Sequence, residues 1–473
     1  MAREAGYRAG AAAAIGVLLL WYSQTRAFAW DEGYHLVAAQ LVAGGKRLYL
    51  DFCFPQPPLN TYWNAAWIRF LGAGWRLIHA AAAVLCLATA WIAAGWARSR
   101  FPNPEWRHTA ALAVLFTVGL NVLVVQYGPT GQAYAFTLIL IVIAYRITVR
   151  AVETPRVTIA GLAGLAAGAA AAATLLSAPV GVVLLVWLVV YNRAGSRWKK
   201  AGALIAGEAA AFLPLLWLFV QDPRRVFFNV VEYELLYRQV EWEGALAHDV
   251  TVWISWLDSS HGLVLAVLAS GGLLLVKFRS AWTRAQRAEF YLCGWLAGAL
   301  IVHISQAHPT FERYYMLAVP FLAILTAAAV YSMGTRWAVA ALAVVLAGGL
   351  AKTISEEDAY TWPYLEPLAR KVDEVTPPGA PIEADEQIYF LTRRTPPSGM
   401  ELMDSHKLDF AKAKAGWLHL VSEAEVGRMI EAGEFATVES CGEYEDFDRA
   451  AAAIYRQRAK LASCTVYWAA DKH

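Results

Sequence analysis

Charged residues are scarce in this sequence: Asp, Glu, Lys and Arg make up only 16% of its 473 residues, while 58% are hydrophobic. A soluble globular domain contains roughly 45–50% apolar residues, so the composition excludes an ordinary soluble protein and predicts a polytopic membrane protein. The formal net charge of +2 also lacks the basic excess typical of nucleic-acid-binding proteins. We therefore expect membrane lipids, and no nucleic acid, among the partners of the chain.

The first apolar run lacks an obvious cleavage site. It covers Ala9 to Ala29, follows Arg3 and Arg8, and leads directly into Trp30. Because about 20 apolar residues span a bilayer, this run predicts a retained membrane helix with its N-terminus in the cytoplasm. Ten further runs bring the expected spans to eleven: Trp75 to Ala97, Thr109 to Gln126, Ala133 to Ile147, Val157 to Leu176, Pro179 to Tyr191, Ala201 to Val220, His261 to Phe278, Phe290 to Ser305, Tyr314 to Met333 and Trp337 to Ala351.

Lys and Arg residues collect in alternate loops, as they do on the cytoplasmic side of membrane proteins. These basic loops are 98–107, 146–156, 193–200 and 277–287. The loop 31–74, the loop 221–260 and the whole C-terminal part then face the extracytoplasmic side. The pattern predicts a multi-pass protein of the plasma (inner) membrane with its C-terminus outside.

Hydropathy falls after Lys352, so residues 1–352 are expected to form a membrane domain and residues 353–473 a soluble domain of ordinary size. Within the membrane domain, the Gly/Ala-rich stretch Gly161 to Ala173 favours close helix packing. The soluble domain is expected to be α/β, with strands at Gly416 to Val421, Phe435 to Val438 and Thr465 to Trp468, and helices at Glu423 to Ala432 and Asp446 to Leu461. The fold class is therefore mostly α, with a small extracytoplasmic α/β domain.

Only five cysteines are present, and their positions differ in meaning. Cys441 and Cys464 both lie in the outward-facing domain, where an oxidising compartment permits a disulfide if their Cα atoms approach closely enough. Cys53 would then be a lone external thiol.

The loop after the first span combines carboxylates with a turn-rich, aromatic sequence. Asp31 and Glu32 stand at its start, and Tyr49, Asp51 and Pro57-Pro58-Leu59 follow. Carboxylates gathered at a membrane surface indicate chemistry. The plain alternatives are a helix N-cap at Asp31 and a turn cap at Asp51. The aromatic helical segment that ends the loop is expected to lie in the membrane interface.

These features together resemble the GT-C glycosyltransferases: the Asp31-Glu32 pair at the outer end of helix one, Tyr49-x-Asp51, Pro57-Pro58-Leu59, many spans and an external tail. Within that superfamily the chain resembles family 39, which includes protein O-mannosyltransferases and bacterial transferases that put aminoarabinose on lipid A. The resemblance is strongest over Met1 to Arg150. It implies inverting transfer of a sugar from a polyprenyl phosphate carrier to a glycan, lipid or protein acceptor in the cell envelope.

The implied reaction needs a base but no acid, because polyprenyl phosphate is already a good leaving group while the acceptor hydroxyl must lose a proton. Asp31 matches the family's aspartate at the end of helix one and is our candidate base. Glu32 is the second catalytic candidate. It could orient the base, bind sugar hydroxyls or coordinate a cation, and the alternative is a helix N-terminal carboxylate favoured by the helix dipole.

The leaving phosphate needs cationic groups, since charge builds up on its oxygens. Arg313 stands in a turn at the outer mouth of a span, where many superfamily members carry an Arg-Tyr pair. A loop arginine is otherwise a solvated or lipid-headgroup contact. The substrate-binding candidates are Lys46, Tyr49, Asp51, His308, Arg313 and Tyr314.

The turn from Gln126 to Gln132 contains no acid, although many relatives carry a second acidic residue there. This departure argues against a two-carboxylate site with a bound divalent metal. We expect an enzyme without a cofactor and without a metal.

Two other functions fit a chain with many spans. A transporter or flippase without catalysis is the first, and a ligase that transfers a whole glycan chain is the second. The spans lack paired charged residues at mid-membrane and show no inverted halves with broken helices, which argues against transport.

Overall fold

The computed structural model describes residues 2–241, 244–258, 260–278, 282–356, 360–442, 445–461 and 463–469. The chain is mostly helical and forms two compact units. The first combines Met1–Ala27, His79–Leu215 and Gly244–Asp358, and the second combines Phe28–Ile78, Leu216–Glu243 and Ala359–His473. The loop residues Phe28–Ile78 therefore fold with the C-terminal residues rather than with the helices of the first unit.

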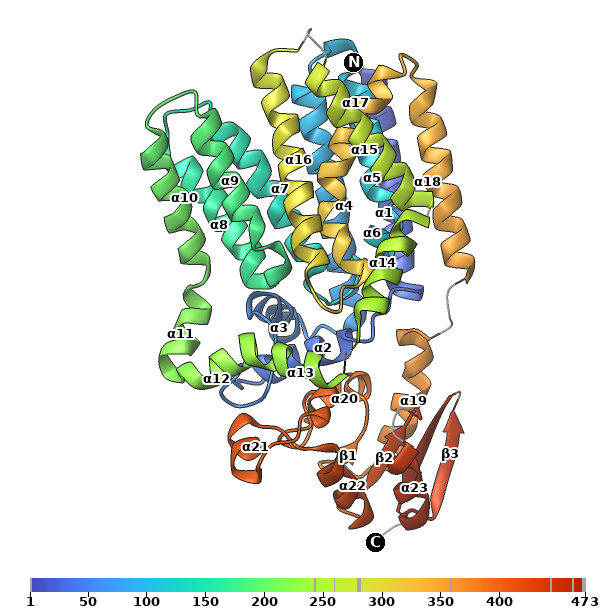
Figure 1. The fold of residues 1–473 in the computed structure, drawn as a ribbon. Coiled ribbons are helices and arrows are strands. Elements are labelled where there is room, and N and C mark those ends of the chain that lie inside the picture. The colour runs from blue at the N-terminus through green and yellow to red at the C-terminus, as the bar shows by residue number, and fades with distance from the viewer. Residues whose placement is uncertain are drawn as a thin grey trace. The chain divides into compact units, whose positions relative to one another are not determined.

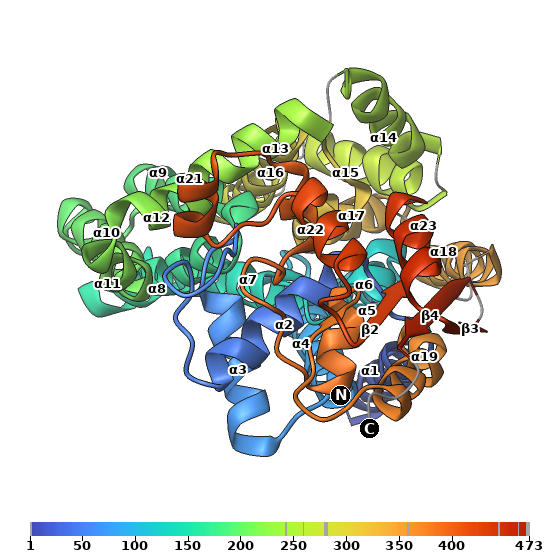
Figure 2. The same ribbon diagram turned by 90° about the horizontal axis from the view of Figure 1, so that it is seen from below.

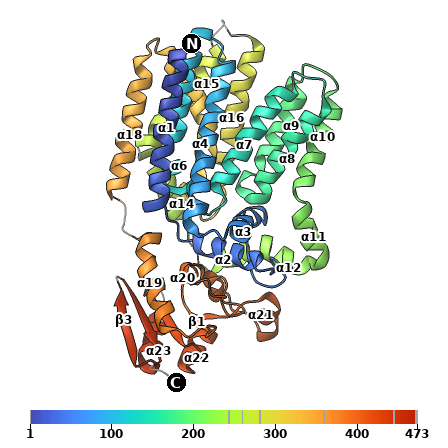
Figure 3. The ribbon, with the colours of Figure 1, turned by 180° about the vertical axis from the view of Figure 1, so that it is seen from behind.

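The first unit is a bundle of apolar helices. Its long members run side by side in Figures 1 and 3, and α8, α9 and α10 pack together at one edge. The core is built largely from Ala, Leu and Val side chains, which pack closely around Trp96 and Trp187. Its helices are α1 Ala2–Thr25, α4 Trp75–Arg100, α5 Arg107–Gly119, α6 Val122–Tyr127, α7 Tyr134–Ala151, α8 Val157–Ala173, α9 Pro179–Tyr191, α10 Arg197–Ala211, α14 Leu246–Asp258, α15 Ser260–Phe278, α16 Arg284–Ser305, η4 Glu312–Ala318, α17 Val319–Ser332 and α18 Trp337–Glu356.

Several of these helices are long and apolar enough to cross a membrane, as a polytopic membrane protein requires. Within the described residues five pass by length and composition, or six if α10 and the following α11 (Leu213–Gln221) form one bent span. Shorter apolar helices account for other expected spans, such as Val157–Ala173 and Gly262–Phe278. The multi-span class is confirmed, whereas the count of eleven spans and the orientation stay predictions.

Glycines allow α8 and α10 to approach closely. A Cβ atom at Gly164 would overlap the backbone of Leu204, and one at Gly207 would overlap the carbonyl oxygen of Gly161. Small residues at such positions let helix backbones pack at short range inside a membrane protein. The close packing expected from the stretch Gly161 to Ala173 is confirmed.

The second unit carries the loop helices and a small sheet. Its helices are α2 Glu32–Ala43, α3 Leu59–Leu71, α12 Pro223–Phe227, the π-helical turn η3 Phe228–Glu232, α13 Tyr233–Glu241, α19 Trp362–Val375, α20 Glu386–Thr392, η5 Met403–Lys407, α21 Lys412–Leu418, α22 Glu423–Glu431 and α23 Glu445–Ile454. One apolar cluster joins three distant segments, since Cys53, Phe228 and Tyr233 pack against Leu402 and Leu418. Cys53 is thus a free thiol that is buried in this cluster.

The sheet has four strands in the order β1-β2-β4-β3. They are β1 Ile382–Glu383, β2 Thr437–Ser440, β3 Gln457–Leu461 and β4 Cys464–Trp468. Strand β1 runs parallel to β2, and the other two pairs are antiparallel. Figure 2 shows α22 and α23 beside these strands. Cys441, directly after β2, is disulfide-bonded to Cys464, so these two cysteines do pair.

Two predictions for the C-terminal residues are wrong. The expected strand at Gly416 to Val421 begins within helix α21, and the expected helix Asp446 to Leu461 ends at Ile454 and gives way to β3. The strands near Phe435 to Val438 and Thr465 to Trp468 and the helix from Glu423 are confirmed. The small α/β character of this part therefore holds, although its details differ.

Glu439 makes the stability of this sheet depend on pH. Burial raises the pKa of Glu439 to about 8, and the nearby carboxyls of Glu383 and Asp448 add to the shift. A carboxyl whose pKa is raised in the folded state contributes most below its unfolded pKa, and that stability is lost as pH rises through the folded value. We expect the protection of the β2 and β4 amides against hydrogen exchange, relative to their intrinsic exchange rates, to fall between roughly pH 4.5 and 8. The Glu439→Gln protein should show a weaker dependence, and an unchanged profile would contradict this reading.

Candidate functional site

Asp31 immediately precedes α2. Its backbone has φ −70° and ψ −4°, and its side chain makes no capping hydrogen bond to the helix. The carboxylate is half-buried and lies close enough to Glu234 on α13 to raise the pKa of that residue. The N-cap alternative for Asp31 is therefore not supported, and the carboxylate lies in a polar cluster of the second unit.

The start of α2 is held by tight packing. Glu32 is fully buried, and its Oε2 accepts a hydrogen bond of 2.8 Å from the indole nitrogen of Trp362. A Cβ atom on Gly33 would lie 2.7 Å from Cδ of Gln387, so α20 approaches the backbone where only glycine fits. Gln387 also donates to the carbonyl oxygen of Trp30 at 3.0 Å. These contacts fix the backbone on both sides of Asp31.

Tyr49 and Asp51 shape the first loop. Tyr49 has a left-handed backbone (φ 67°), is buried, and donates its hydroxyl to the carbonyl oxygen of Gln56 at 2.7 Å. Asp51 accepts from the backbone nitrogen of Arg47 at 2.7 Å and from its Nη2 at 2.8 Å. The Arg47 guanidinium lowers the pKa of Asp51. The turn-cap role that the sequence left open for Asp51 fits this geometry.

Lys46 is exposed on the same loop and acts on two carboxyls. Its charge lowers the pKa of both Asp51 and the buried Glu401. Burial raises the pKa of Glu401 to about 7, although the carboxylate accepts a 2.7 Å hydrogen bond from the backbone nitrogen of Gly399. Lys46 is thus a cation beside a carboxyl that titrates near neutral pH.

Glu234 is a further candidate close to Asp31, and the sequence did not single it out. Gln56 donates to its Oε1 at 3.3 Å and Arg238 to its Oε2 at 3.4 Å. Burial raises the pKa of Glu234, the charges of Asp31 and Asp404 raise it further, and Arg238 opposes them. A second carboxylate therefore accompanies Asp31, but it comes from α13 rather than from the turn at Gln126. The only signal in the sequence was the pair Glu234 and Arg238, four residues apart in the loop 221–260.

The candidates His308, Arg313 and Tyr314 belong to the first unit. His308 contacts Asp249 of α14 through Nδ1. The Arg313 guanidinium lies 4.3 Å from the ring centre of Phe311 and 5.4 Å from that of Tyr314, within cation–π range. The ring of Tyr314 also lies 6.4 Å from that of Tyr134. The structure thus groups the six binding candidates into two sets, one in each unit.

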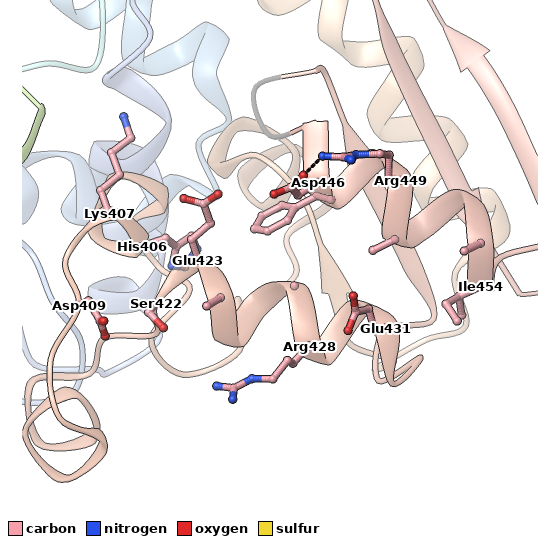
Figure 4. Close-up of a pocket in the computed structure, with 15 residues that line it drawn as sticks. His406, Lys407, Asp409, Ser422, Glu423, Arg428, Glu431, Asp446, Arg449 and Ile454 are labelled. Carbon is pink, nitrogen blue, oxygen red and sulfur yellow. Dashed lines mark hydrogen bonds and ion pairs between the residues drawn. The ribbon is translucent and has the colours of Figure 1, made fainter.

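A groove of 790 Å³ lies in the C-terminal part of the second unit, between α22 and α23 (Figure 4). None of the residues expected from the sequence lines it. Its cations already have acidic neighbours: Arg449 pairs with Asp446, as Figure 4 shows, and Lys407 pairs with Asp404 at 3.2 Å. The cations of this groove are thus paired within the described residues, and volume alone does not make it the site.

One group among the described residues has the spacing of a metal site: Glu439, Cys441 and Cys464. The two cysteines are bonded to each other, so they offer no thiolate to a metal. The metal-independent enzyme stays a prediction.

No family model matches the chain, and no curated protein matches it. Among solved structures it is similar to ArnT from Cupriavidus metallidurans bound to undecaprenyl phosphate, with a TM-score of 0.69 and 14% identity over 96% of this chain and 97% of that one. The apo state of the same protein gives a TM-score of 0.70 with 14% identity over 96% of both chains. The archaeal oligosaccharyltransferase AglB from Archaeoglobus fulgidus, in complex with an inhibitory peptide and a dolichol-phosphate, gives 0.51 with 10% identity over 98% of this chain and 74% of that one.

At these identities the likeness concerns the fold, and it extends over nearly the whole chain. The resemblance inferred from the first loop and the spans is confirmed at that level. This polytopic membrane protein has the fold of the GT-C glycosyltransferases.

Proposed function

We propose that the chain is an inverting glycosyltransferase that moves a sugar from a polyprenyl-phosphate-linked donor to an acceptor on the extracytoplasmic face of the membrane. The GT-C fold over 96% of the chain carries the proposal. Two of the similar structures hold an undecaprenyl phosphate and a dolichol-phosphate, which supports a lipid phosphate as the leaving group. The position of Asp31 at the start of α2 supplies the base.

The reaction needs two kinds of group: a base that takes the acceptor's proton and a cation that stabilises the charge on the leaving phosphate. The acceptor oxygen forms a bond to the anomeric carbon while its proton moves to the Asp31 carboxylate. The bond between that carbon and the phosphate oxygen breaks, and the electron pair stays on the phosphate. Arg313 is the proposed cation for the phosphate, because preorganised positive charge stabilises a developing anion.

The other candidates act through these groups. Glu32 positions the start of α2 through its bond to Trp362, and Tyr49 and Asp51 shape the loop that carries Lys46. Tyr314 holds the Arg313 guanidinium against its ring. Glu234 adds a negative charge beside Asp31, which favours transfer of the acceptor's proton to the Asp31 carboxylate.

Replacing Glu234 by glutamine is expected to lower kcat on the order of tenfold, because the variant removes the charge beside the base. The exposed Glu232 on the preceding turn gives a matched control, Glu232→Gln, with wild-type kinetics. An unchanged kcat in Glu234→Gln would remove Glu234 from the site.

The proposed activity is tested by mass spectrometry of lipid-linked sugars and outer-surface glycans in cells with and without the gene. Loss of the enzyme should accumulate one sugar-phosphate lipid and remove one surface modification. A lipid carrying a long glycan would indicate chain transfer, the ligase alternative. Unchanged lipid-linked sugars would overturn the proposal and favour the transporter or flippase.

A further inference from the structure

Side chains of helix α14 contact the turn that precedes η4, at His308 and Thr310. The carboxylate of Asp249 contacts Nδ1 of His308 at 2.5 Å and accepts a 2.7 Å hydrogen bond from the backbone nitrogen of Thr310. The neighbouring His248 contacts the carbonyl oxygen of Thr310 through Nε2 at 3.0 Å. Two successive residues of α14 thus hold both sides of the turn, within the first unit.

Asp249 and His308 differ sharply in exposure. Asp249 is 3% exposed, whereas the His308 side chain is 48% exposed. A carboxylate is buried only where its oxygens have partners, and Asp249 has one on each oxygen. Because Nδ1 of His308 faces Asp249, Nε2 on the opposite side of the ring is the atom available to a ligand. A buried carboxylate that fixes one nitrogen and leaves the other accessible determines how the imidazole is presented.

The same turn offers further polar groups. The Thr310 hydroxyl is fully buried and has no hydrogen-bond partner in the described part of the chain. The Arg313 guanidinium lies over Phe311, and Glu312 accepts a hydrogen bond from Ser255 of α14. Glu312, the acid of the turn, is therefore engaged by α14, while the His308 side chain is about half exposed at the same turn.

We propose that Asp249 is a positioning residue for phosphate binding, which holds His308 so that its Nε2–H donates a hydrogen bond to the phosphate of the polyprenyl-linked donor. This inference rests on the proposed function. A protonated imidazole donates through both nitrogens, so one serves Asp249 and the other an anion. When the glycosidic bond breaks, the electron pair stays on the phosphate oxygen and this donor stabilises it. The proton of His308 is not transferred.

Two substitutions of His308 separate this role from a purely structural one. The amide nitrogen of glutamine takes the place of Nε2, and that of asparagine takes the place of Nδ1. If Nε2 binds the phosphate, His308→Gln should bind nearly as well as wild type and His308→Asn should be weaker by about tenfold or more. If His308 only joins the turn to α14, the order reverses and the proposal is overturned.

The probe is undecaprenyl phosphate, titrated into the full-length protein in detergent and followed by tryptophan fluorescence. Asp249→Asn should raise the Kd by about tenfold, because its amide faces Nδ1 as a donor and changes how the ring is protonated. His303→Gln, on α16, is the matched control and should bind like wild type. A thermal unfolding midpoint equal to that of wild type shows that each variant is folded. Equal Kd values for Asp249→Asn and wild type would overturn the inference.

Two further outcomes separate this inference from the proposed function. Wild-type protein that fails to bind undecaprenyl phosphate would overturn both. Wild-type protein that binds it, with variants that bind equally, would overturn only the role of Asp249 and His308. Phosphatidylglycerol is the competitor. If it displaces undecaprenyl phosphate at equal concentration, the turn binds bilayer headgroups and the inference is overturned. If undecaprenyl phosphate resists displacement, the result supports a donor site.

Discussion

The Asp31→Asn protein is expected to keep its fold and to lose glycosyl transfer by about 10²- to 10⁴-fold, the range that a general base contributes. Asparagine has nearly the same shape but cannot take the acceptor's proton. The loss should appear in kcat rather than in KM for the lipid donor, because the amide leaves the phosphate-binding cations unchanged. Single-turnover transfer from the donor identified by mass spectrometry measures it.

The matched control for that measurement is Asp373→Asn. Asp373 lies on α19, has a half-exposed side chain and pairs with Arg394 at 3.2 Å. An ion pair with one half-exposed partner contributes little more than a surface pair, about 0–1 kcal/mol, and Asp373 is not among the candidate site residues, so the variant should work at the wild-type rate. Transfer that survives in Asp31→Asn would place the base elsewhere, and outward movement of a lipid or glycan that survives without any transfer would favour a transporter.

The Trp362→Ala protein is expected to lose about 3–5 kcal/mol of stability in the second unit, the usual cost of removing a buried tryptophan. Trp362 is fully buried, stacks on Trp75 with ring centres 5.9 Å apart, and packs edge-on against Phe390 at 5.8 Å. Hydrogen exchange of α2 and α19 should quicken together, since this one side chain contacts both elements.

Trp362→Phe isolates the hydrogen bond from the packing. Phenylalanine keeps most of the apolar contact but leaves the buried Glu32 carboxylate without the indole donor, at a cost of about 1–3 kcal/mol. Glu32→Gln keeps an acceptor oxygen for Trp362 and should be milder than Trp362→Phe. If all three variants exchanged like wild type, the bond between α2 and α19 would have no role in stability.

The sequence predicted the membrane class and the GT-C resemblance because these follow from properties of local segments. Apolar runs mark the spans, and Asp31, Glu32 and Tyr49 lie close together along the chain. Glu234 and Asp249 could not be found in this way. Each joins its site through a partner far away in sequence: Glu234 contacts Gln56, and Asp249 contacts His308.

The errors in the C-terminal part have a physical reason as well. The segment Gln457-Arg-Ala-Lys-Leu consists of residues with high helix propensity, yet it forms the edge strand β3. Pairing with β4 along the full length of β3 outweighs that weak local preference. The segment Gly416 to Val421 shows the opposite error, because a short apolar run has no periodicity that separates a strand from a buried helix end.

The bond between Cys441 and Cys464 joins the end of β2 to the first residue of β4, where Ser440 and Thr465 are already paired across the sheet. Such a bond forms and persists only in an oxidising compartment. Maturation of the sheet is thereby linked to the redox state of the compartment in which it folds: a copy that folded in a reducing compartment would keep both thiols reduced and would lack this cross-link between β2 and β4.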